Sequence, residues 1–161
     1  MDTLPSEIID ERAILKLANK LSAALDERNM GALTECFTSD ALMKSELYEV
    51  RGHAAIIALN DTMWETVGEL QHVLSNCEVS VTGDAATMRS NVVGTHVARG
   101  APERIFFIGA VYCDRLVRTQ AGWRIAERRT HIVWTKGDIT VIGGAAQSPP
   151  IHTTDVKSMQ V

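Results

Sequence analysis

The sequence predicts a single α+β domain in which helices come first and an antiparallel sheet follows. Up to about residue 67, apolar residues recur at helical spacing, whereas residues from about 70 to 135 form successive apolar and β-branched runs. Gly and Pro turns bound these runs, and helices followed by strands is the α+β order. The length of 161 residues suits one domain with a substantial core.

The helical part divides into three segments. The first opens at Pro5 and Ser6 and runs to about residue 28, and Asn29 can cap a second helix that ends near residue 37. A short strand is expected over residues 41–50. Gly52 then precedes a third helix over residues 53–67.

Four strands are expected in the second half, over residues 70–82, 85–98, 104–119 and 123–135. They are longer than average strands, which predicts a strongly curved sheet with bulges. The domain is expected to span residues 1–142. Residues 143–161 contain one Gly–Gly pair, one Pro–Pro pair and little periodicity, and they are expected to form an extended tail. This tail is either a disordered terminus or an arm over a pocket or a neighbouring subunit.

Composition excludes several classes of protein. The net charge is −4 and the basic residues are scattered, which argues against a nucleic-acid partner. Cys36, Cys77 and Cys113 are odd in number and far apart, which argues against a disulfide framework or a zinc site. The acidic start MDTLPSEIIDER is no signal peptide and no apolar run reaches membrane-spanning length, so a cytoplasmic protein without a membrane partner is expected.

Motifs for bound groups are also absent from the sequence. There is no H-x-x-x-H pattern, Cys–His cluster or paired acidic loop, so no metal is expected. There is no glycine-rich phosphate loop, GxSxG elbow or dinucleotide fingerprint either. We therefore expect no cofactor.

Asp26 is the first candidate site residue. On a helical wheel it lies beside Ser22 at the edge of the apolar arc, away from the face that carries Lys20. A carboxylate next to the core is costly unless something pairs with it. Asp26 is therefore either a pocket carboxylate or a surface residue that interacts with Arg28 or Asn29.

His72 is the second candidate. It lies near the start of a predicted strand, two residues before Leu74, so both side chains should face inward. Taken alone, a histidine on an apolar face is more often a satisfied core residue than a catalyst.

The last strand offers further candidates, because alternate residues share one face: Trp123, Ile125, Glu127, Arg129 and His131. If the two apolar residues face the helices, the three polar ones point towards a pocket, and Arg128 and Thr130 face outward. Arg129 could then hold a carboxylate or phenolate, and His131 could be a second acid. The consecutive charges could instead form a solvated ion pair, and a bulge would reverse the parity.

Tyr48, Trp64 and Asn76 are weaker candidates for substrate binding. Trp64 falls near the end of the third helix, where an aromatic ring could flank a flat substrate. Each of the three could equally be a packing or surface residue.

Four segments together resemble the SnoaL-like family of the nuclear transport factor 2-like superfamily: AILKLANKLSAALDERNMGALTECFTSDA, RGHAAI, QHVLSNCEVSVTGDAATMRS and YCDRLVRTQAGWRIAERR. They are similar to the family's opening helix pair, third helix, first long hairpin and final hairpin. The resemblance covers roughly residues 8–135. It implies a cone-shaped, cystatin-like α+β fold in which a curved antiparallel sheet wraps around the N-terminal helices.

The resemblance also implies roles for the two leading candidates. In the family's dehydratases and its dehydrochlorinase, a first-helix Asp and a histidine that opens this strand form the catalytic pair, and Asp26 and His72 match both positions. A carboxylate can orient an imidazole, fix its tautomer and stabilise the imidazolium formed on proton uptake. Relatives place a Lys or Tyr five residues before the Asp, where this chain has Leu21. Other groups must then stabilise oxyanion charge or protonate the leaving group.

The sequence therefore favours a cofactor-independent lyase (a dehydratase or another elimination or C–C lyase) or an isomerase. The expected substrate is a small, apolar cyclic or aromatic compound. The alternative is a non-catalytic ligand-binding module or an oxygenase small subunit, because fold does not settle function. A homo-oligomer is expected, a trimer ahead of a dimer, because an open sheet leaves apolar outer-face residues such as Val92, Val117 or Ile132 to be covered.

Overall fold

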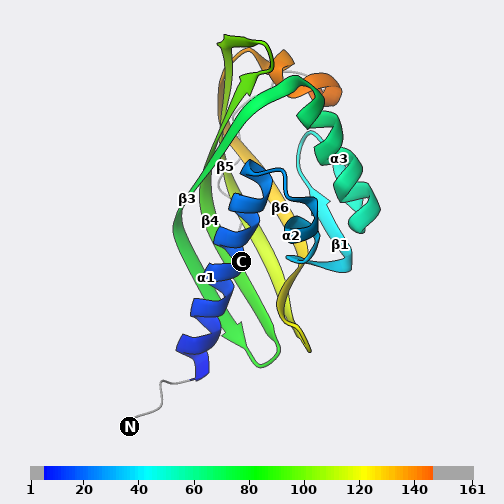
Figure 1. The fold of residues 1–161 in the computed structure, drawn as a ribbon. Coiled ribbons are helices and arrows are strands. Elements are labelled where there is room, and N and C mark those ends of the chain that lie inside the picture. Colours follow the sequence, from blue (N-terminus) through cyan, green and yellow to red (C-terminus); the bar gives the residue numbers. More distant parts are fainter. Residues whose placement is uncertain (1–5, 147–161) are drawn as a thin grey trace.

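The computed structural model describes residues 6–146, in which a curved sheet wraps around one long helix (Figure 1). The helices are α1 (Ser6–Asp26), α2 (Met30–Thr34), α3 (His53–Thr66) and the 3-10 segment η1 (Ile139–Ala146). The strands are β1 (Phe37–Lys44), β2 (Glu49–Arg51), β3 (Val67–Thr82), β4 (Ala85–Ala98), β5 (Ala101–Thr119) and β6 (Gly122–Gly137).

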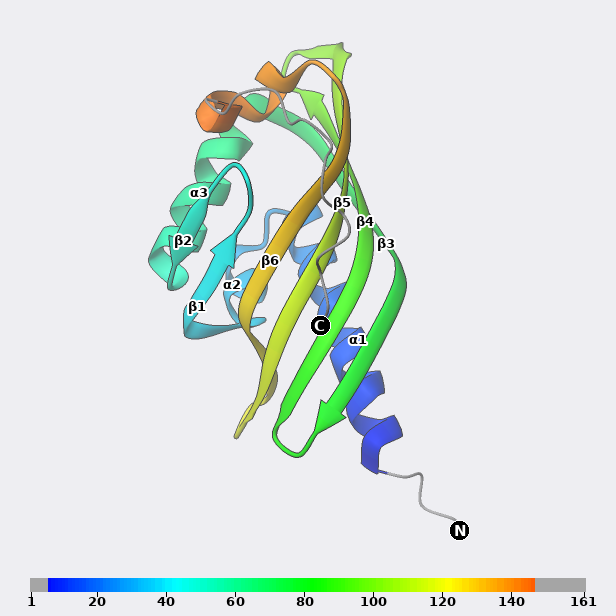
Figure 2. The same ribbon diagram turned by 180° about the vertical axis from the view of Figure 1, so that it is seen from behind.

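These strands form one sheet in the order β2-β1-β6-β5-β4-β3. Neighbouring strands are antiparallel, except that β1 runs parallel to β6. The sheet is not closed, and α1 lies along its concave face (Figures 1 and 2). The predicted α+β fold with a curved sheet around the first helix is confirmed.

Two predicted element boundaries were wrong. The strand expected over residues 41–50 is two strands, because the Ser45 hydroxyl accepts hydrogen bonds from the backbone N–H groups of Leu47 and Tyr48 at 3.0 and 3.3 Å and holds a turn there. The second helix ends at Thr34 and not near residue 37. The Cys36 carbonyl beyond it accepts from the Ile125 N–H at 2.9 Å, so strand pairing takes over.

The end of α1 is fixed against the start of β3. Arg28 has a left-handed φ of 57°, which stops the helix just after Asp26. Its guanidinium donates to the carbonyls of Val67, at 2.9 Å, and Gly68. This anchor holds Asp26, at the last turn of α1, close to β3.

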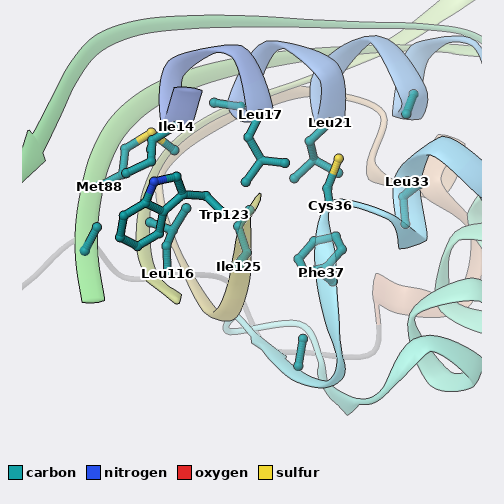
Figure 3. Close-up of a cluster of buried hydrophobic side chains, with 14 of the residues drawn as sticks. Ile14, Leu17, Leu21, Leu33, Cys36, Phe37, Met88, Leu116, Trp123 and Ile125 are labelled. Carbon is teal, nitrogen blue, oxygen red and sulfur yellow. The ribbon is translucent and has the colours of Figure 1, made fainter. Parts of the chain in front are cut away.

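The narrow half of the cone is a continuous apolar core between α1 and the sheet (Figure 3). Ile14 and Leu21 of α1 pack against Leu116 of β5 and Trp123 and Ile125 of β6. Each such side chain contributes about 1.5–3 kcal/mol when removed from water. This half is filled, so a cavity has room only towards α3.

A smaller cluster closes the wide end beneath η1 and α3. Val67, Phe106 and Val141 are almost fully buried there. Residues 143–146, predicted as the start of an extended tail, belong to η1. The remainder of the predicted tail lies outside the described residues.

Bulges shift the strand β6 relative to β5. Arg115 pairs with Glu127 but Leu116 pairs with Ile125, so Ala126 is an extra residue. A second bulge leaves Val133 extra between Ile132 and Trp134. Since each extra residue exchanges the two faces of a strand, these bulges decide which β6 side chains point inward.

Candidate active site

A cavity of about 360 Å³ lies between the concave face of the sheet, α3, η1 and the end of α1. Most of its wall is apolar, with Leu25, Leu59, Met63, Phe106 and Ile108 among the lining residues. Nine of the lining residues have polar side chains: Ser45, Tyr48, Asn60, Thr62, His72, His96, Tyr112, Arg128 and Thr130. A small apolar cavity with few polar groups is the usual form of a small-molecule site.

Asp26 and His72 form a hydrogen-bonded pair in which His72 lines the cavity and Asp26 lies behind it, outside the set of lining residues. The Nδ1 atom of His72 lies 2.7 Å from Oδ1 of Asp26. The backbone N–H of His72 also donates to both carboxylate oxygens at 3.0 Å. The side chains are 9% and 24% exposed, for His72 and Asp26. Because a carboxylate only accepts, the Nδ1 atom carries a proton, and in the neutral ring the second nitrogen, Nε2, holds the lone pair.

The first helix provides no side chain that could replace the Lys or Tyr that relatives have at the position of Leu21. Leu21 is 1% exposed and belongs to the apolar core. Lys20 forms an exposed ion pair with Glu35 at 2.6 Å. Neither side chain lines the cavity. In this chain α1 therefore contributes the Asp26 carboxylate without a neighbouring Lys or Tyr.

Arg128 of β6 is a charged side chain on the cavity wall, several strands away from His72 of β3. Its Nε and Nη2 atoms donate to the two oxygens of Asp114, each at 2.7 Å. The two side chains are 4% and 0% exposed, and the guanidinium carbon lies 4.0 Å from the centre of the Tyr112 ring. Burial alone would lower the pKa of Arg128, but the Asp114 carboxylate outweighs it and raises that pKa above its ordinary value. Arg128 is thus a fixed cation.

Two tyrosine hydroxyls complete the polar wall. Burial raises the pKa of Tyr48, against the opposing influence of the nearby Thr130 and Arg128. Burial also raises the pKa of Tyr112, although Arg128 opposes it. Both phenols are therefore neutral hydrogen-bond donors around neutral pH.

His96 of β4 lies next to His72 on the cavity wall. The two imidazole rings meet edge to face with centres 6.0 Å apart. The Nδ1 atom of His96 lies 3.3 Å from the carbonyl oxygen of Phe106. Burial, followed by the neighbouring His72, lowers the pKa of His96 to about 4. His96 is therefore a neutral imidazole at physiological pH.

Glu127, Arg129 and His131 do not face the cavity, so the predicted parity of the last strand was wrong. Glu127 pairs with Arg115 and Arg129 on the outside of the sheet, at 2.9 and 2.6 Å. His131 contacts Glu46 at 3.2 Å. The bulge at Ala126 is the reason, because Trp123 and Ile125 before it face inward while Arg128 and Thr130 after it do so as well.

The weaker candidates are separated by the structure. Tyr48 lines the cavity. Trp64 is buried in α3 but is not among the lining residues. Asn76 is exposed, with a left-handed φ of 49° at a bulge of β3. Neither Trp64 nor Asn76 is in a position to contact a ligand in the cavity.

Sequence reasoning missed Arg128, His96, Tyr112 and Asn60 as cavity residues. A signal existed for His96, because it shares the even-numbered face of β4 with Met88 and Val92, both of which are buried. Val92 and Ile132, which were expected on the outer face, line the cavity instead. No local signal marks Arg128.

Within residues 6–146, no group of three or more His, Cys, Asp or Glu side chains gathers where it could hold a metal ion. Across the same residues, no helix combines the length and the apolar character that crossing a membrane requires.

Sequence comparison supplies the family. The profile of the SnoaL-like domain matches residues 6–129, which includes Asp26, His72, His96 and Arg128. The chain belongs to the SnoaL-like family. An uncharacterized protein of Mycobacterium tuberculosis is 31% identical to this SnoaL-like chain over 128 residues, which cover 76% of this chain and 85% of the relative.

Solved structures share the fold. A Novosphingobium aromaticivorans protein, provisionally named an aromatic ring hydroxylase, superposes with a TM-score of 0.78 at 25% identity and covers 87% of this chain and 99% of its own. The hexachlorocyclohexane dehydrochlorinase LinA-type3 of Novosphingobium barchaimii superposes with a TM-score of 0.73 at 18% identity, covering 82% and 92%. The fold of this SnoaL-like protein is therefore one that enzymes also use.

Proposed function

We propose that this SnoaL-like protein is a cofactor-independent lyase, with isomerisation as the second outcome of the same proton abstraction. The observation that carries the proposal is the 2.7 Å contact between Asp26 and His72 at the edge of an apolar cavity. A carrier has no need of a partly buried carboxylate paired with a histidine, because removing both from water costs energy that ligand binding does not require. The dehydrochlorinase among the structural neighbours performs an elimination, which agrees with this chemistry.

The proposed base is Nε2 of His72. Asp26 accepts the Nδ1 proton and the backbone N–H of His72, which fixes both the tautomer and the ring orientation. When Nε2 takes a proton from the substrate, the Asp26 carboxylate stabilises the resulting imidazolium. The electron pair left on the substrate then expels a leaving group or shifts a double bond.

Arg128 is the proposed stabiliser of developing negative charge. Two of its nitrogens are bound by Asp114, and among the described residues Nη1 has no acceptor. A prepositioned cation in an apolar site can stabilise an enolate or phenolate oxygen strongly. Tyr48, a neutral phenol on the same wall, is the proposed proton donor to a leaving group. Arg128 and Tyr48 would together supply the assistance to the leaving group that relatives obtain from a Lys or Tyr at the position of Leu21.

The cavity defines the class of substrate. Its volume of about 360 Å³ and apolar wall suit a compound of one or two rings. Asp114 already compensates the charge of Arg128. A neutral compound whose oxygen gains charge only during the reaction therefore fits better than a carboxylate. This is the small cyclic or aromatic substrate expected from the sequence.

Turnover of a panel of hydroxylated aromatic and alicyclic compounds, with products followed by mass spectrometry, tests the proposal. His72→Gln should keep the fold and lose roughly 100- to 10,000-fold in rate. Asp26→Asn should lose a similar factor, because an amide can favour the wrong tautomer. His53→Gln is the matched control, since His53 contacts the Phe37 carbonyl away from the cavity.

Full turnover by both dyad variants with unchanged melting would make the pair structural and refute the proposal. Tight binding of panel members without any turnover would favour the alternative of a ligand-binding module or oxygenase subunit.

We also propose that the protein is a homo-oligomer, a trimer ahead of a dimer. Val73, Val93 and Trp134 lie in one row across the outer face of β3, β4 and β6, with Gly109 of β5 between the last two. They are 55%, 39% and 46% exposed. An apolar row of this kind is stabilised when a partner covers it.

A further inference from the structure

His96 is a buried polar side chain that the proposed proton abstraction does not use. It is 5% exposed and lies on the same cavity wall as His72. A polar group that a bound ligand would cut off from water is costly unless the ligand pairs with it, so its second ring nitrogen bears on what the cavity can bind.

The hydrogen bond at Nδ1 fixes the tautomer of His96. A backbone carbonyl can only accept, so the contact with the Phe106 oxygen at 3.3 Å requires the proton to be on Nδ1. The other nitrogen, Nε2, then carries a lone pair, and the hydrogen bonds of residues 6–146 involve only Nδ1 of this cavity-lining ring. The lowered pKa, about 4, means that this lone pair stays unprotonated at neutral pH.

Among residues 6–146, no side chain donates to this nitrogen. The neighbouring ring of His72, 6.0 Å away between centres, presents an acceptor at its own Nε2 in the neutral tautomer that Asp26 favours. The other donors on the wall, such as Arg128 and Tyr112, belong to other elements and make no hydrogen bond to His96. Two imidazole acceptors therefore lie side by side on the cavity wall, where water or a hydroxyl group of a bound ligand can supply the missing hydrogen.

We propose that Nε2 of His96 accepts a hydrogen bond from a hydroxyl group of the substrate, so that this residue selects neutral hydroxylated ring compounds over ethers and halogenated rings of the same shape. This inference rests on the proposed function, because both place the substrate in the same cavity. It adds that the substrate must carry a hydroxyl group. A site built to bind a hydroxyl rejects an analogue without it, because the acceptor is then left buried and unpaired.

Binding of 2-naphthol and of its methyl ether, 2-methoxynaphthalene, tests the proposal by calorimetry at pH 7. The two probes share a ring system that fits the cavity, and only the first can donate. The unmodified protein should prefer 2-naphthol by roughly 2- to 12-fold, the range of one net hydrogen bond. His96→Leu should abolish that preference. His72→Gln should retain a preference, because His96 is intact.

A second measurement uses the unmodified chain and covers the case that His96→Leu does not fold. The ¹⁵N resonance of His96 Nε2 should move upfield from the free imine range when 2-naphthol is added, and should not move with the ether. Equal affinity for both probes, no binding of 2-naphthol at millimolar concentration, or an unmoved resonance would each overturn the proposal. Turnover does not enter either experiment, so failure of the His72 mechanism would be seen separately in the activity panel.

Discussion

Breaking the buried ion pair between Asp114 and Arg128 is predicted to destabilise the fold strongly. Both side chains are almost fully buried and joined by two hydrogen bonds of 2.7 Å. Replacing Asp114 with Leu leaves the guanidinium without its counter-charge, and removal of one partner from a buried pair costs about 3–5 kcal/mol. Because Arg128 borders a cavity that water can enter, we expect the lower end of that range.

The magnitude translates into a measurable melting shift. In a chain of this size, 1 kcal/mol changes the melting temperature by about 2–4 °C, so Asp114→Leu should lower it by roughly 6–12 °C. Arg128→Met should also destabilise, since it leaves the Asp114 carboxylate buried and alone. The double variant should recover to within about 1 kcal/mol of the original protein, because a hydrophobic replacement of both partners is close to neutral.

Thermal and urea unfolding followed by circular dichroism measure this cycle. Arg115→Met is the control, since Arg115 is 58% exposed in its ion pair with Glu127 and an exposed pair is worth less than about 1 kcal/mol. The account of Arg128 as a fixed, compensated cation would be refuted if the changes in unfolding free energy of the two single variants added up to that of the double variant. It would also be refuted if Asp114→Leu lowered the unfolding free energy no more than the control does.

Three further predictions concern His96, the outer face and assembly. His96 has a folded-state pKa of about 4 against an ordinary value near 6.5. Between pH 6.5 and pH 4 the unfolded chain therefore binds a proton at this histidine and the folded chain does not. The free energy of unfolding should fall by up to about 3 kcal/mol as the pH drops through that window. Urea titrations of His96→Gln should show a smaller dependence of that free energy on pH. A Cβ added at Gly109 would lie 2.1 Å from the Trp134 ring, so Gly109→Ala should displace the indole, and an unchanged fluorescence spectrum would contradict this. Light scattering should show an oligomer that Trp134→Glu dissociates, whereas a monomer at micromolar concentration would exclude the proposed assembly.

Local patterns were sufficient for most of the architecture and for the Asp26–His72 pair. Helical spacing, strand alternation and Gly turns follow from backbone geometry over a few residues, and β4 was predicted with the bounds that the structure has. Asp26 at the edge of a helical apolar arc and His72 in phase with Leu74 are both statements about one element. The resemblance to the SnoaL-like family then joined them, and the structure brings them into contact.

The rest of the candidate site depended on tertiary structure. One extra residue at Ala126 exchanges the faces of β6, which turns Arg128 inward and Arg129 outward. Nothing local in the sequence marks this bulge, because it is set by the pairing of β6 with β5. The role of Asp114 as a counter-charge likewise depends on its pairing with Arg128 across two strands. The role of His96 depends on its position beside His72 on the cavity wall. A strand pattern of period two predicts faces reliably until one residue is inserted, and only the packed sheet shows where that happens.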